Sequence, residues 1–272
     1  MKIYFPRDIG QKYYGAHYKF LFNILKFMDL DVKLCEPEPR PAGGFIIRIG
    51  DKRALIDFSN FLQPVDEDKN VDIYFKYEYP RDYRAQYRNM YPLGKISFHD
   101  WSDYFRLRQV IKYSCNTDRI LNNQRARHGA QERRLKARKI LQDRYGGLVD
   151  IEITDMLEFW MKINSCLISV CVPGQRNDIL DRGQFQYMAF GACTISPRLN
   201  IVLPYMKLLE SGVHYVECAE DYSNLVETVE WCKQHRAQCI DIGNNAKKLF
   251  WETCIPSAIW EWMCIALERE AS

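Results

Sequence analysis

The feature that most constrains the fold is a regular alternation of strand-like and helix-like segments after about residue 108. Residues 166–173 form a continuous apolar run, "CLISVCVP", which is typical of a strand buried on both faces. Helix-like segments are present at 130–147, 155–165, 182–191 and 222–235, and strand candidates at 110–115, 149–154, 166–173, 192–196 and 213–218. Such alternation predicts a mostly parallel sheet with helices on both faces. Because open parallel sheets bind ligands beyond the carboxyl ends of their strands, functional residues are expected in the loops there.

The first part of the chain is less regular. It begins with a strand candidate at 2–5, a helix at 17–28 with one apolar face, and a strand at 31–35. Residues 45–49 and 53–58 resemble a hairpin around Gly50 and Asp51. We therefore expect an α/β protein with two lobes and a cleft between them. The predicted boundaries are a lobe at 1–110, a lobe at 111–255, and a terminal helix at 256–272 crossing back to the first lobe.

Composition limits the class of protein. The formal net charge of +3 does not predict a nucleic-acid binder, so any such role needs a local cluster. No apolar run is long enough to span a bilayer, and the first residues lack the apolar region of a signal peptide. The ten cysteines show no CxxC pair and no zinc-ligand spacing, which favours reduced thiols in a cytoplasmic protein. No acidic pair stands in a context that suggests a bound divalent metal; the "DED" of 66–68 reads as a solvated loop.

The segment "DRGQFQYMAFGACTISPR", residues 181–198, raises the possibility of an anion site. Asp181 is placed to cap a helix, with Gln184 completing a reciprocal capping pattern. Capping does not account for Arg182 and Gly183 in the first turn. A helix N-terminus favours a phosphate, Arg182 adds a forked cation, and Gly183 permits close approach to the backbone. Arg176 in the preceding loop adds another cation, whereas Asp178 and Asp181 oppose an anion unless their oxygens are occupied.

Two stretches resemble known glycosyltransferases. The block 166–196, with Met188, Ala189 and Gly191 in "QYMAFGACTI", resembles the donor-binding segment of GT-B glycosyltransferases. The block "LLESGVHYVECAEDYSNLVETVEW", residues 208–231, is similar to protein O-glucosyltransferases and capsule-associated glycosyltransferases, and less closely to exostosin-type enzymes. Near the N-terminus, "DIGQKYYGAHYKFLFNIL" looks like the glycine-containing loop and first helix that follow the opening GT-B strand.

The resemblance implies two Rossmann-like lobes in a GT-B-like arrangement. It implies transfer of a sugar from a nucleotide-diphosphate donor, UDP- or GDP-linked, to a hydroxyl of a glycan or protein acceptor, without a metal or other cofactor and with inversion. Gln186 aligns with the family's ribose-binding glutamate, although an amide is a weaker acceptor than a carboxylate. His214 lies in the second matched stretch. As a strand residue it would point to the opposite sheet face from Tyr215, so that only one of the two faces the ligand.

Three residues are candidates for the general base. In several inverting families a glycine-histidine in the first loop places the base, and this chain has His17 one residue further from its glycine. Imidazole suits this role because its unperturbed pKa lies near neutrality. The alternative is that His17 is only the first buried residue of its helix. His99 and Asp100 at a predicted strand end are the rival base, with a turn and a helix cap as their structural alternative.

Residues 125–139, "RARHGAQERRLKARK", are strongly basic. One interpretation is that Arg125 or Arg127 reaches the donor diphosphate, because cations stabilise a departing nucleotide. The other interpretation is that Arg133, Lys136 and Lys139 lie on a solvent-exposed face of the helix. Two further functions remain open: a non-catalytic nucleotide- or glycan-binding protein on the same fold, and a nucleic-acid binder that uses this stretch. We expect the glycosyltransferase, and no nucleic-acid partner.

Overall fold

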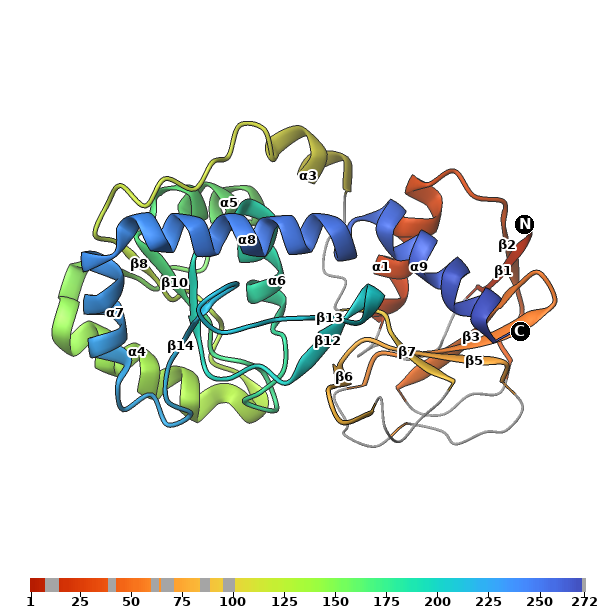
Figure 1. The fold of residues 1–272 in the computed structure, drawn as a ribbon, viewed down its shortest axis with the longest axis horizontal. Helices are drawn as coiled ribbons and strands as arrows, with labels where there is room; N and C mark the ends of the chain where they lie inside the picture. The colour runs from red at the N-terminus through yellow and green to blue at the C-terminus, as the bar shows by residue number, and fades with distance from the viewer. Residues whose placement is uncertain are drawn as a thin grey trace. The chain divides into compact units, whose positions relative to one another are not determined.

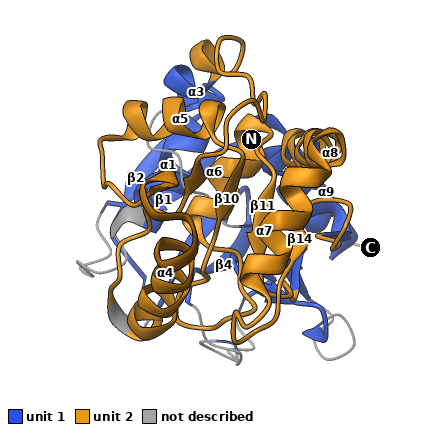
Figure 2. Cartoon of the chain, turned by 90° about the vertical axis from the view of Figure 1, so that its left-hand side faces the viewer, with its two compact units in different colours: residues 1–104, 201–208, 252–272 blue, residues 105–200, 209–251 orange. Residues whose placement is uncertain are grey.

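The computed structural model describes residues 1–7, 15–38, 43–59, 64, 71–83, 89–94 and 101–270 (Figure 1). They form a mixed α/β structure with two compact units, coloured separately in Figure 2. Unit 1 consists of residues 1–104, 201–208 and 252–272, and unit 2 of residues 105–200 and 209–251. Residues 201–208, which we expected inside the lobe 111–255, thus belong to unit 1, as does the C-terminal helix.

Unit 2 is built on a five-stranded sheet in which all neighbours are parallel. Its strands are β8 (Ile120–Leu121), β9 (Val149–Asp150), β10 (Ile168–Val170), β11 (Thr194–Ser196) and β14 (Val216–Glu217). Their spatial order is β14-β11-β10-β8-β9. If the five strands are numbered 1 to 5 in chain order and read from the β9 edge, their order is 2-1-3-4-5. This is one of the two common orders of doubly wound sheets. The alternation in the sequence is therefore confirmed as a parallel sheet.

The helices of unit 2 follow the strands in turn. They are α4 (Gln131–Tyr145), α5 (Met156–Ser165), α6 (Arg182–Phe190), α7 (Leu225–Gln234) and α8 (Arg236–Cys254), which continues into unit 1. Helix α4 packs against α7, and α5 packs against α6. The core between helices and sheet is apolar, with Ile120, Leu141, Ile168, Ile195 and Val229 among its buried members. Burial of this apolar surface is what holds the short strands in place.

Unit 1 contains a six-stranded sheet in the order β2-β1-β3-β4-β5-β7. Its strands are β1 (Ile3–Pro6), β2 (Val32–Cys35), β3 (Gly44–Ile49), β4 (Lys52–Asp57), β5 (Ile73–Lys76) and β7 (Met90–Pro92). Only β3 runs antiparallel to its neighbours, because it forms the predicted hairpin with β4 through Gly50, whose φ is +65°. The sheet is therefore mixed.

Helices α1 (Gly15–Phe27) and α9 (Pro256–Arg269) pack together within unit 1. Trp262 of α9 donates its indole N–H to Pro92 O at 2.6 Å, which ties the end of the chain to β7. A second small sheet joins β6 (Tyr79–Pro80), β12 (Ile201–Leu203) and β13 (Lys207–Leu208). The short helix α3 (Trp101–Leu107) spans the sequence boundary between the units.

Some predicted elements differ from the structure. Residues 110–115 are not a strand; the first strand of unit 2 is β8, five residues later. The strand expected at 213–218 is reduced to β14, because residues 212–214 form a turn. Strand β7 lies in the less regular first part of the chain, at a position where we predicted no strand.

The cysteines behave as predicted. All ten are free thiols, and all except Cys35 and Cys264 are buried. In the described part of the chain, no helix has both the length and the apolar character required to cross a bilayer.

Candidate functional site

The topology of unit 2 directs attention to the carboxyl ends of β8 and β10. These strands are neighbours, and the chain leaves them in opposite directions, from β8 through α4 to β9 and from β10 through α6 to β11. Doubly wound sheets bind ligands at this type of switch point. The loops that follow the two strands, residues 122–130 and 171–181, are therefore the candidate site.

Gln124 joins the two loops. Its Oε1 accepts from Val172 N at 2.6 Å, and its Nε2 donates to Asp181 Oδ1 at 2.8 Å. Asn122, two residues earlier, donates from Nδ2 to Val170 O at 3.1 Å. Beyond the end of β8, these side-chain amides thus take the place of backbone hydrogen bonds between the strands. They hold both loops against the sheet.

Arginines of α4 brace the loops from the other side. Arg134 donates to Arg125 O at 2.7 Å, to Val172 O at 3.1 Å and to Asp181 Oδ2 at 2.8 Å. Arg138 donates to Gln124 O at 2.7 Å. Burial lowers the pKa of Arg138, and the neighbouring Arg134 lowers it further.

This arrangement corrects our interpretation of one residue of the basic stretch. Arg133, assigned to a solvated face, is half-buried and donates to the carbonyl oxygens of Gly174 and Gln175. Lys136 and Lys139 are exposed as expected, and Lys139 pairs with Asp143 at 2.7 Å.

The first turn of α6 is the third part of the candidate site, after the two loops and the arginines of α4. Asp181 is its N-cap, with Oδ1 accepting from Gly183 N at 2.9 Å. The reciprocal half of the predicted capping pattern is absent: both amide atoms of Gln184 are buried and have no hydrogen-bond partner in the described structure. Gln184 is only 1% exposed. A buried amide without partners is costly, so this side chain marks a site that water or a ligand would satisfy.

The charges around α6 are partly compensated. Arg176 pairs with Asp178 at 2.6 Å, and Arg134 pairs with Asp181. Both aspartates that oppose an anion therefore have their oxygens occupied. Arg125, Arg127 and Arg182 are exposed. The exposed cations at these loops are therefore these three guanidinium groups, whereas the amide N–H of Gly183 is occupied by the cap.

Two residues implied by the resemblance lie elsewhere. Gln186 is buried, and its Oε1 accepts from Trp160 Nε1 at 2.8 Å, so its amide serves contacts between α6 and α5. His214 lies in the turn before β14, not in a strand, and its Nδ1 accepts from Glu210 N at 3.1 Å. Burial lowers the pKa of His214, although the nearby Glu210 opposes the shift.

In unit 1, His17 lies beside the carboxyl ends of β4 and β5. Its ring stacks on Phe58, which follows β4, with centroids 5.6 Å apart and planes at 7°. Tyr77, which follows β5, donates its hydroxyl to His17 O at 3.1 Å. His17 thus belongs to an aromatic cluster and also lies at the sheet edge where α/β folds bind ligands. The rival base residues, His99 and Asp100, lie outside the described residues.

A buried ion pair reinforces this edge of unit 1. Lys76, the last residue of β5, donates from Nζ to Asp57 Oδ2 at 2.7 Å, and both side chains are fully buried. Tyr74 donates to the same oxygen at 2.5 Å, and Ser59 N donates to Asp57 Oδ1 at 2.8 Å. The pair fixes the two strand ends beneath Phe58 and Tyr77, because a buried charge keeps its partner close.

Sequence reasoning missed Gln124, Arg134 and Arg138. The available signal was the amide-rich stretch "NNQ", residues 122–124, directly before the arginines. Without the position of β8 it could not be placed at a strand end. Among the described residues, no group of three or more His, Cys, Asp or Glu side chains is arranged to hold a metal ion.

Neither a protein-family model nor a curated protein matches this chain.

Proposed function

We propose that the chain is a glycosyltransferase of GT-B type that uses a nucleotide-diphosphate sugar. One observation carries the proposal: at the switch point of a doubly wound parallel sheet, the loop after β8 and the first turn of α6 carry three exposed arginines. Doubly wound sheets bind nucleotides at this position, and forked guanidinium groups bind phosphate oxygens in pairs. Unit 2 is then the donor lobe.

The roles of the residues follow from their places. Arg125, Arg127 and Arg182 bind the diphosphate and stabilise the charge that develops on the departing nucleotide. Arg134 and Gln124 position the loops and do not contact the donor.

Unit 1 supplies the acceptor side and the base. His17 is at the carboxyl edge of its sheet, where an imidazole is able to accept the proton of an acceptor hydroxyl as the sugar carbon is attacked. The acceptor is a glycan or a protein hydroxyl, and the transfer is inverting and independent of a metal. The rigid edge formed by Asp57 and Lys76 keeps Phe58, and with it the His17 ring, in place.

A thermal-shift screen against UDP, GDP, CDP, dTDP and their sugars tests the donor site. A ligand that binds only the folded state raises the melting temperature according to its affinity, by about 2.7 kcal/mol of stability at a hundredfold excess over Kd. We expect a shift with at least one nucleotide. Arg182→Ala should weaken the binding at least about tenfold, because a charge-assisted contact is worth about 1.5–3 kcal/mol.

Arg144→Ala is the matched control, since Arg144 is exposed in the last turn of α4, at the opposite end from the loops. It should leave the shift unchanged. An equal shift in wild type and Arg182→Ala would remove Arg182 from the site, and no shift with any nucleotide would reject the proposal.

A non-catalytic nucleotide- or glycan-binding protein is the second candidate. The observation that favours it is the contact of Gln186 with Trp160, which leaves no acidic ribose contact at this position. Binding of a nucleotide sugar without turnover, across a broad set of acceptors and water, would establish this alternative. We do not propose a nucleic-acid surface, because Arg133, Arg134 and Arg138 use their N–H groups on carbonyl oxygens of the loops.

A further inference from the structure

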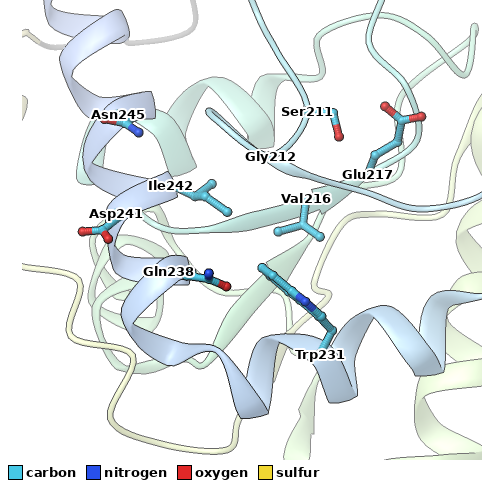
Figure 3. A pocket seen from close by; sticks show the side chains of 9 residues that line it. All are labelled: Ser211, Gly212, Val216, Glu217, Trp231, Gln238, Asp241, Ile242 and Asn245. Carbon is cyan, nitrogen blue, oxygen red and sulfur yellow. The ribbon is translucent and has the colours of Figure 1, made fainter.

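Unit 2 contains a pocket whose lining includes none of the loop residues described above. It has a volume of about 390 Å³ and is lined by residues of the turn at 211–212, of β14, of α7 and of α8 (Figure 3). This volume is in the range of pockets that hold small molecules. Every lining residue belongs to unit 2, so the pocket is a property of that unit alone.

The centre of the pocket is apolar. Val216 of β14, Ile242 of α8 and Trp231 of α7 project toward it, with the amide of Gln238 beside the indole (Figure 3). The Trp231 ring stacks on His235, with ring centroids 4.6 Å apart and planes at 14°. The stack fixes the orientation of the indole, which therefore offers a preformed aromatic surface to a ligand.

The charges at the pocket are all of one sign. Glu217 and Asp241 are exposed, and the Tyr215 hydroxyl donates to Glu217 Oε2 at 3.5 Å. None of the nine residues that line the pocket is Lys or Arg. Because the whole chain has a formal net charge of +3, the pocket is a local acidic region on a slightly basic protein. This electrostatic environment selects against anions and favours cations.

The arrangement of these groups also restricts the shape of the ligand. Figure 3 shows Ile242 and Val216 near the centre, and Asp241 and Glu217 at opposite margins of the pocket with their carboxylates directed away from its centre. A ligand that satisfies this pattern has cationic groups near both ends and an apolar segment between them. A compact monocation leaves one carboxylate without a partner, and a neutral sugar leaves both.

We propose that this pocket binds a linear aliphatic polyamine. Its terminal ammonium groups pair with Glu217 and Asp241, and its methylene segment lies on Val216, Ile242 and the indole of Trp231. An ammonium group near the indole gains a further cation–π attraction, for which tryptophan is the best partner. The pocket does not overlap the proposed donor site, so its occupation can be tested separately from nucleotide binding.

Isothermal titration calorimetry with spermidine at low ionic strength tests the proposal, because exposed charge pairs are weakened by salt. We expect saturable binding at one site per chain. The double variant Glu217→Gln, Asp241→Asn should weaken it about tenfold, the effect of losing two partly exposed ion pairs. The matched control is Glu220→Gln, Glu227→Gln, which removes the same charge from exposed positions of unit 2 outside the pocket. It should change the affinity less than twofold.

Three results would overturn the proposal. They are no heat with spermidine up to millimolar concentration, equal weakening in the two double variants, or binding of maltotriose by a protein that does not bind spermidine. Circular dichroism melting of each variant shows that the fold is retained. Trp231→Leu provides a second route, since it keeps both carboxylates and should still weaken spermidine binding several-fold by removing the aromatic surface.

Discussion

At the scale of single residues, one carboxylate organises the candidate donor site. Asp181 caps α6 through Gly183 N, pairs with Arg134 and accepts from Gln124. The three contacts link the loop after β8, helix α4 and helix α6. Asp181 is therefore both a local helix cap and a contact that connects segments distant in the sequence.

Two alanine variants compare the stability contributed by a helix cap alone with that contributed by Asp181, which also makes tertiary contacts. Asp155 caps α5 by accepting from Glu158 N at 2.9 Å, and it is exposed. Asp155→Ala should lower the free energy of unfolding by about 1 kcal/mol, the usual value of a cap. Asp181→Ala should lower it by about 2–3 kcal/mol, since it also leaves the half-buried guanidinium of Arg134 without its partner. Urea denaturation measures both values, and equal losses would show that Asp181 acts only as a cap.

At the scale of elements, the packing of α8 on the end of α6 depends on two glycines. Gly191 ends α6 with φ +76°, a conformation that favours glycine. Gly243 of α8 lies against it, and a Cβ on Gly243 would be 2.0 Å from Gly191 O. The two backbones can approach this closely only because Gly243 carries no side chain.

Gly243→Ala tests this contact. The added methyl group has no space because the atom that it meets is backbone, so α8 has to move away from α6. We expect a loss of at least about 3 kcal/mol in the free energy of unfolding, or failure to fold. Gly147→Ala is the control, because a Cβ there meets nothing within 4 Å, and it should change stability by less than about 0.5 kcal/mol. A small effect of Gly243→Ala in thermal denaturation would contradict the close approach.

At the scale of the whole molecule, the chain passes between its units several times. Unit 1 receives residues 201–208 and 252–272 in addition to the N-terminal part, whereas the proposed donor residues all belong to unit 2. The proposed base, His17, belongs to unit 1. The two tasks of the proposed enzyme, donor binding and proton abstraction, are thus assigned to different units, and variants should separate them.

His17→Ala should retain the nucleotide-induced thermal shift and reduce sugar transfer at least about a hundredfold, the lower range for a general base. His17→Phe preserves an aromatic ring against Phe58 and should lose transfer equally, which distinguishes the base from a packing role. Added imidazole should restore part of the transfer rate of His17→Ala if the variant lacks only the base. It should restore nothing if the substitution instead disturbs the fold. An unchanged transfer rate, with the donor found in the thermal-shift screen, would exclude His17 as the base.

The sequence alone determined the elements whose signals are local. The apolar run at 166–173 predicted a buried strand, Asp181 predicted a helix cap, and Gly50 predicted a hairpin turn, because each depends on neighbours a few residues away. Strand β8, with two residues, has no periodicity to detect. Residues 110–115 looked more strand-like and were wrongly chosen.

Only the tertiary structure decided which polar side chains form hydrogen bonds that hold the fold together. Arg133 looked like a solvated cation and Gln186 like a ligand contact, yet the first braces a loop and the second bonds Trp160. The order of the sheet and the place of residues 201–208 were also decided at this level. The physical reason is that a local pattern reports which side chains prefer burial. The partner that each polar group meets depends on segments that are distant in the chain.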